Sequence, residues 1–143
     1  MMTRRKGRTR IPPFSVIGAW QPDTFLIATW RGVAKQIGRT YAGLGMAQLL
    51  HMFPPTGWIL THLGTGHEVC QITAHEPQAF ALADQIAALG DWDFDGLEGW
   101  RNRDPDLMQR LHAFLKLHPE ATRSGLNNHY EEFAREIAMA RTS

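Results

Sequence analysis

The chain has 143 residues and a formal net charge of +1, with 43% hydrophobic and 20% charged side chains. This length and balance are typical of one soluble globular domain with a continuous core, and they exclude a disordered chain. Cys70 is the only cysteine, which excludes an internal disulfide, and no apolar run reaches the roughly 18 residues needed to cross a bilayer. We therefore expect a cytoplasmic protein that is not bound to a membrane.

The basic residues are distributed unevenly. Five of the 15 lie within the first ten positions: Arg4, Arg5, Lys6, Arg8 and Arg10. The other 10 stand against 14 acidic residues, so the remainder of the chain carries a net charge of about −4. Pro12 and Pro13 favour extended backbone and separate a flexible basic arm, residues 1–13, from a single domain, residues 14–143. A basic arm on an acidic domain is typical of chains that contact nucleic acid or an acidic partner; a solvated terminus that only aids solubility is the alternative.

The first half of the domain is predicted to consist of strands. Residues 14–20 and 24–30 are rich in β-branched and aromatic side chains, with a turn over 21–23 between them. A hairpin turn at residues 31–32 leads into residues 33–47, which also fit helical spacing. The three glycines of that segment favour strand, because each costs a helix about 1 kcal/mol relative to alanine.

The strongest hairpin signal lies in residues 57–73. Two runs rich in β-branched and aromatic residues flank a turn of Gly64, Thr65 and Gly66, where glycine supplies the positive φ of a tight turn. Apolar side chains occupy both faces of the first run. This strand is therefore predicted to lie inside the sheet.

Three helical patterns follow the strands. The first runs from Glu76 to Gly90, the second from Asp104 to His118, and the third begins at Asn128. The links between strands are of hairpin length and leave no room for parallel crossovers. We therefore predict an α+β fold, in which an antiparallel β-sheet in the N-terminal two-thirds is covered by about three helices in the C-terminal half.

An acidic segment between the first two helices resembles an ion-binding loop. Aspartates alternate there with aromatic residues: Asp91, Trp92, Asp93, Phe94 and Asp95. Carboxylates at positions 1, 3 and 5 are those of an EF-hand calcium loop, but Asn102 stands where that loop has a bidentate glutamate. A loop anchored by its two aromatic side chains is the favoured interpretation.

The hairpin region also carries side chains that can bind a metal: His62, His67, Cys70 and His75. They lack the helical spacing of a zinc site and there is no second cysteine, so structural or exposed histidines are favoured. Cys70 lies in an apolar strand, where a buried and inert thiol is expected. We therefore predict no catalytic residue, no metal site and no cofactor.

Aromatic residues give a further nucleic-acid feature because bases can stack on them. The candidates are Trp20, Tyr41, and Trp30 beside Arg31; core positions under the helices are the alternative for the two tryptophans. The predicted nucleic-acid or partner-binding residues are thus the five basic residues of the arm together with Trp30 and Arg31.

The hairpin carries a pattern formed by Trp58, Thr61, His62, Thr65 and Gly66. Together with the alanine-rich helix and Asp91-Trp92-Asp93 that follow, it resembles short uncharacterised proteins carried on bacterial phages and plasmids. The resemblance covers about residues 57–95 and implies a mobile-element accessory protein, a class that includes anti-CRISPR and anti-restriction inhibitors of host defence. It supplies no functional residues.

We therefore predict a small non-enzymatic binding protein that acts stoichiometrically on a nucleic-acid-handling protein complex of the host or on nucleic acid itself. The basic arm and the five tryptophans of the chain support this hypothesis, since aromatic and arginine side chains supply much of the binding energy at interfaces. The alternative is a metal-dependent enzyme or ion-binding module that uses Asp91, Asp93 and Asp95.

Overall fold

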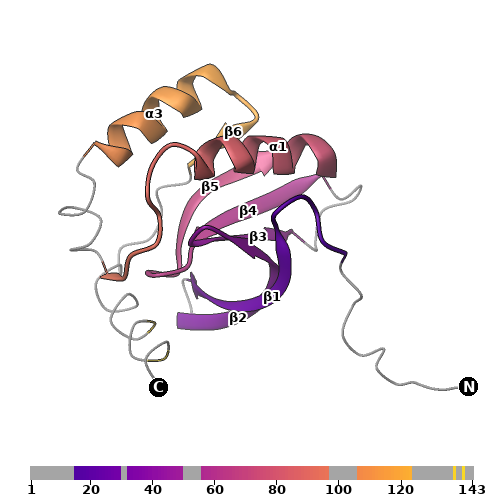
Figure 1. Cartoon of the computed structure of the whole chain (residues 1–143), viewed down its shortest axis with the longest axis vertical. Coiled ribbons are helices and arrows are strands. Elements are labelled where there is room, and N and C mark those ends of the chain that lie inside the picture. The colour runs from indigo at the N-terminus through magenta and orange to yellow at the C-terminus, as the bar shows by residue number, and fades with distance from the viewer. Residues whose placement is uncertain are drawn as a thin grey trace, which may run out of the picture.

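The computed structural model describes residues 15–29, 32–49, 56–96 and 106–123, together with Ile137 and Ala140. These residues form a six-stranded antiparallel sheet and two helices (Figure 1). The strands are β1 (Gln21–Thr29), β2 (Gly32–Tyr41), β3 (Leu44–Gln48), β4 (Gly57–His62), β5 (His67–Thr73) and β6 (Ala121–Thr122), and the helices are α1 (Glu76–Ala87) and α3 (Leu107–Leu117). The predicted α+β class with an antiparallel sheet is therefore confirmed.

The sheet is a meander in which each strand pairs with its neighbours in sequence, in the order β1-β2-β3-β4-β5-β6. Residues 33–47 are strand, as predicted, with a turn at Ala42 and Gly43, where φ is 54° and 86°. The central hairpin is also confirmed, and β4 lies between β3 and β5. Its turn spans residues 63–66.

The beginning of the sheet differs from the prediction. Residues 21–23 start β1 and do not form a turn, because β1 is an edge strand in which Pro22 can lack an amide donor. The predicted strand over 14–20 is replaced by a tight turn at Gly18 (φ 57°), closed by an isolated bridge between Ile17 and Trp20. The predicted strand over 24–30 is confirmed to Thr29.

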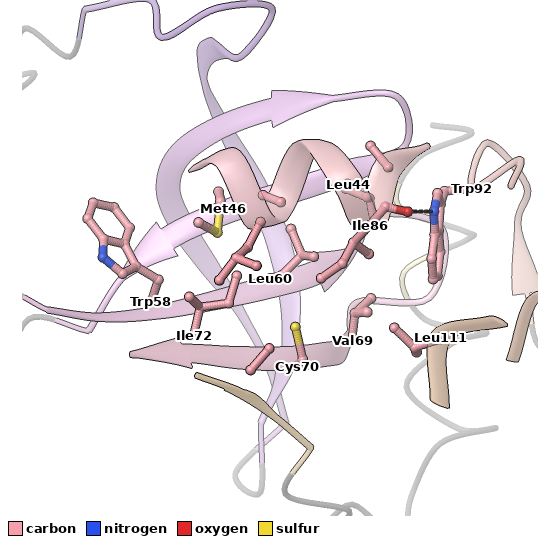
Figure 2. Packing of buried hydrophobic residues seen from close by; sticks show 14 of the residues in the cluster. Leu44, Met46, Trp58, Leu60, Val69, Cys70, Ile72, Ile86, Trp92 and Leu111 are labelled. Atoms are coloured by element: carbon pink, nitrogen blue, oxygen red, sulfur yellow. Dashed lines mark hydrogen bonds between the residues drawn. The ribbon is translucent and has the colours of Figure 1, made fainter. Parts of the chain in front are cut away.

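The main core lies between one face of the sheet and the helices, as Figure 2 shows. The register of β2 to β5 places Leu44, Met46, Leu60 and Cys70 on this face. Helix α1 adds its buried side chains Ala79, Phe80, Leu82, Ala83, Ile86 and Ala87, and α3 adds Leu107, Leu111 and Phe114. The helices thus join a single hydrophobic cluster with the sheet.

The opposite face of the sheet is strongly curved (Figure 1). Phe25 is buried there, and its ring occupies the space beside Gly45, where an added Cβ would lie 2.7 Å from the ring. At the far end of β1 the amide of Ala28 donates to the carbonyl oxygen of Gly66, 2.8 Å away. The first strand therefore curls back to the beginning of β5.

Both described helices were predicted, with different ends. Helix α1 stops at Ala87 with Ala88 as its C-cap, before Gly90. Helix α3 begins at Leu107 with Asp106 at the N-cap, whereas Asp104 was predicted to cap it and lies outside the described residues. The short edge strand β6 was not predicted. The start of the third predicted helix at Asn128 lies outside the described residues, although Ile137 and Ala140 are helical.

Candidate functional site

All seven residues predicted to bind nucleic acid or a partner lie outside the described residues: Arg4, Arg5, Lys6, Arg8, Arg10, Trp30 and Arg31. Their role stays a prediction. Of the other two stacking candidates, Trp20 is fully buried and belongs to the core, so it offers no platform to a base. Tyr41 is 40% exposed. The core interpretation was therefore the correct one for Trp20.

Ser15 is the first residue that the structure describes, and a buried arginine binds its carbonyl oxygen. Arg39 is 7% exposed, and its Nε donates to the carbonyl oxygen of Ser15 over 2.7 Å. The guanidinium carbon lies 5.4 Å from the centre of the Phe80 ring, within the range of a cation–π contact. The indole Nε1 of Trp20 donates to a carboxylate oxygen of Asp84 over 2.7 Å, which ties the same segment to α1.

Three large apolar side chains in the first part of the described chain are exposed. Val16, Ile37 and Tyr41, named here the apolar patch, are 51%, 45% and 40% exposed. Ile37 and Tyr41 flank Arg39 on one face of β2, because side chains two residues apart in a strand point the same way. Val16 follows the residue that Arg39 binds.

The central hairpin holds a buried hydrogen-bonded group formed by His62, Thr65 and Trp92, named here the histidine clasp. His62 Nε2 lies 2.9 Å from the carbonyl oxygen of Trp92, and His62 Nδ1 lies 2.8 Å from the hydroxyl of Thr65. A carbonyl oxygen can only accept, so Nε2 carries the proton. The hydroxyl of Thr65 accepts from the amide of His67 and can donate to Nδ1. A neutral imidazole satisfies each of these groups.

The clasp joins the hairpin turn to the acidic segment. One glycine of this turn and one of the turn between β2 and β3 let the backbone approach the acidic segment closely. A Cβ on Gly64 would overlap the carbonyl oxygen of Phe94, and one on Gly43 would lie 2.5 Å from that of Trp92. The His62 and Phe94 rings also pack against each other, with centroids 4.3 Å apart. The histidines predicted as metal-ligand candidates thus include one that links two parts of the fold.

The acidic segment is a loop anchored by its aromatic residues, as favoured from the sequence. Trp92 and Phe94 are 1% and 7% exposed, whereas Asp91, Asp93 and Asp95 are exposed. The Trp92 indole donates to the carbonyl oxygen of Ile86 over 2.9 Å (Figure 2). Among the residues that the structure describes, no three His, Cys, Asp or Glu side chains are grouped so that they could hold a metal ion.

Cys70 is fully buried under α1 (Figure 2). Burial, together with the nearby carboxylate of Glu68 and opposed by Arg123, raises the pKa of its thiol to about 12. The nucleophilic thiolate is therefore strongly disfavoured at neutral pH. An inert thiol, as predicted, is what this environment produces.

The described surface is acidic. The described ranges contain nine acidic and five basic residues, which leaves a net charge of −4. Eight of the nine acidic residues are exposed, whereas only Lys35 and Lys116 are exposed among the five basic ones. The charge separation inferred from the sequence thus extends to the surface of the folded body.

In the described part of the chain, none of the helices is both long and apolar enough to cross a membrane. No protein-family model, no curated protein and no solved structure matches this chain.

Proposed function

We propose that this protein is a small, non-enzymatic binding protein that acts stoichiometrically on a nucleic-acid-handling protein complex or on nucleic acid itself. The observation that carries the proposal is the separation of charge: eight exposed carboxylates against two exposed cations on the described body, and five cations in the first ten residues. Arg39 binds the carbonyl oxygen of Ser15, the first described residue of the body.

The basic arm and the acidic body are complementary in charge to different surfaces. The cationic arm is complementary to phosphates, whose neutralisation releases condensed counterions. The acidic body is repelled by phosphates and attracted by the positively charged grooves in which proteins hold nucleic acid. A complex that already contains both a basic groove and nucleic acid offers both kinds of contact at once, and we therefore favour such a complex as the target.

The polar groups of the hairpin have structural roles. His62 and Thr65 are fully buried and hydrogen-bonded to each other, His62 also binds the backbone carbonyl of Trp92, and Cys70 is held as a neutral thiol, so these groups are used to build the fold. The sequence resemblance to accessory proteins of phages and plasmids suggests the biological form of the function, an inhibitor of host defence of the anti-CRISPR or anti-restriction type.

Capture from a bacterial lysate on the immobilised full chain, with and without nuclease treatment, tests the proposal. A protein complex retained in both conditions at a fixed ratio supports a protein target. Material that nuclease treatment removes supports nucleic acid. No stoichiometric capture in either condition contradicts the proposal.

The contribution of the arm is tested by changing its five basic residues to glutamine. If the arm neutralises phosphates of a duplex, binding weakens, and the slope of log affinity against log salt falls by about 0.9 for each phosphate that is no longer neutralised. The matched control changes Lys35 and Lys116, the exposed cations of the body, to glutamine. An unchanged slope in the arm variant would reject this role.

A further inference from the structure

Strand β1 is an edge strand of the sheet, and its first half is open to solvent. It pairs with β2 along one side, and Gln21, Pro22, Asp23 and Thr24 are all exposed. An edge strand presents amide and carbonyl groups on which a strand of another chain can add by hydrogen bonding. The groups that β1 turns away from β2 therefore decide whether such a strand can pair with it.

Alternate residues of β1 turn their backbone groups away from β2. The amide of Ala28 donates to the carbonyl oxygen of Gly66, in the turn before β5, so Ala28 is one of these outward residues. Residues two apart in a strand of an antiparallel sheet direct their backbone groups to the same side. Leu26, Thr24 and Pro22 therefore face outward as well, and an added strand would need their amide hydrogens.

Most of these outward positions have no amide hydrogen to offer. Pro22 lacks one altogether, and the amide of Thr24 donates to Oδ1 of Asp23 over 2.8 Å. The other carboxylate oxygen of Asp23 accepts from the hydroxyl of Thr40 on β2 over 3.1 Å, which holds the carboxylate in place. Within the described residues, Leu26 alone keeps an outward amide that no hydrogen bond uses.

The opposite edge of the sheet is short. Strand β6 has two residues, and the amide of Ala121 donates to the carbonyl oxygen of His118 over 3.0 Å. The charged Arg123 follows the strand directly. Very short strands, proline and charged side chains at an edge are means by which β proteins avoid pairing edge to edge. The described sheet has such features at both edges.

We propose that Pro22 and Asp23 are gatekeepers that close the β1 edge to strand addition. A strand laid along this edge would find the amide of Leu26 alone, with the carboxylate of Asp23 beside it. The folded body therefore does not pair edge to edge with another copy of itself. A partner is recognised through side chains and not through a shared sheet, and this inference does not depend on which complex the protein binds.

Sedimentation velocity of the full chain over concentrations from about 1 to 500 µM tests the two gatekeepers. The double variant Pro22→Thr, Asp23→Val restores the outward amide at position 22 and frees that of Thr24. Its dissociation constant for self-association is expected to be at least about tenfold below that of the wild type, because two further hydrogen bonds become possible. The infrared amide I band of an intermolecular sheet should appear with it. The matched control is Thr24→Val, which adds an apolar side chain to the same exposed stretch and keeps both gatekeepers; it should behave like the wild type.

Circular dichroism and thermal melting establish that the variants are folded. If the double variant does not fold, Asp23→Val alone frees the Thr24 amide and should strengthen association in the same direction. A folded variant that associates no more than the wild type would overturn the proposal, and so would association without the intermolecular sheet band. Equally strong association of Thr24→Val would assign the effect to apolar surface and overturn it as well. Capture of a nucleic-acid-handling complex is measured separately, so either proposal can fail alone.

Discussion

Replacing His62 with phenylalanine removes both nitrogens of the histidine clasp while an aromatic ring stays in place. The substitution deletes the hydrogen bonds to Trp92 and Thr65, of 2.9 and 2.8 Å, in a fully buried position. The ring packing against Phe94 can persist, so the change reports mainly on the polar part of the clasp. We expect the fold to survive with reduced stability.

The magnitude follows from the groups left behind. A buried hydrogen bond contributes about 1 kcal/mol net, and a buried polar group deprived of its partner costs about 1–3 kcal/mol. The carbonyl oxygen of Trp92 still accepts from the amide of Phe94 over 3.0 Å, which reduces its share of this cost. We therefore expect His62→Phe to lower the free energy of unfolding by about 2–3 kcal/mol, a large part of the roughly 5–15 kcal/mol of a typical domain.

Urea unfolding measures this loss as a lower midpoint at an unchanged m-value. Thr65→Val removes the other side of the bond, and the double variant should lose about 1–2 kcal/mol less than the sum of the two single losses. Thr65→Ser keeps the hydroxyl and is the matched control. A His62→Phe protein within about 0.5 kcal/mol of the wild type, or fully additive losses, would refute the clasp as a stabilising unit.

Gly64→Ala tests the packing around the hairpin, and Gly18→Ala is its control. Gly64→Ala is expected to lower the free energy of unfolding by about 3 kcal/mol or more, because its Cβ would overlap the carbonyl oxygen of Phe94. Gly18 has a φ of 57° and open space around the added Cβ, so Gly18→Ala should cost only about 1–2 kcal/mol in urea unfolding. Equal losses would contradict this. Because burial raises the pKa of Cys70 to about 12 from the 9.0 of an ordinary thiol, only the unfolded chain loses the thiol proton between these values. The free energy of unfolding of the wild type should therefore fall with rising pH, by about 1.4 kcal/mol at pH 10 relative to neutral pH. Cys70→Ala should lack this loss, and parallel pH profiles of the two proteins would refute the prediction.

The local patterns were sufficient for the hairpins and for α1. Gly64, Thr65 and Gly66 between two β-rich runs specify a turn through backbone conformation, which needs no knowledge of distant residues. The glycines between residues 33 and 47 favoured strand over helix for the same reason. The turn predicted over 21–23 was wrong because Pro22 and Asp23 are turn formers by propensity. Proline is tolerated in an edge strand, but recognising β1 as an edge strand requires knowledge of the strand order.

The contacts that organise the candidate sites could not be predicted, because they join residues far apart in the sequence. His62 meets Trp92 across 30 positions, and Trp20 meets Asp84 across 64. The burial of Trp20 depends on α1, and β6 consists of only two residues paired with β5. The one signal in the sequence was the occurrence of Thr-His-x-x-Thr-Gly together with an aspartate–tryptophan pair. Only the structure shows that these two motifs meet at the same end of the sheet.

The same two motifs are the basis of the expected resemblance to phage and plasmid proteins, and their place in the fold limits what that resemblance implies. His62, Thr65 and Trp92, which belong to the pattern on which the expected resemblance rests, form the clasp, and Trp58 donates its indole hydrogen to the carbonyl oxygen of Ala74 over 3.0 Å. These residues face inward and have a role in the fold. Another protein with the same pattern is therefore expected to have the same hairpin and loop, and the pattern itself says nothing of a partner. A resemblance confined to residues 57–95 would therefore extend to the scaffold alone, and the partner has to be identified by the capture experiment.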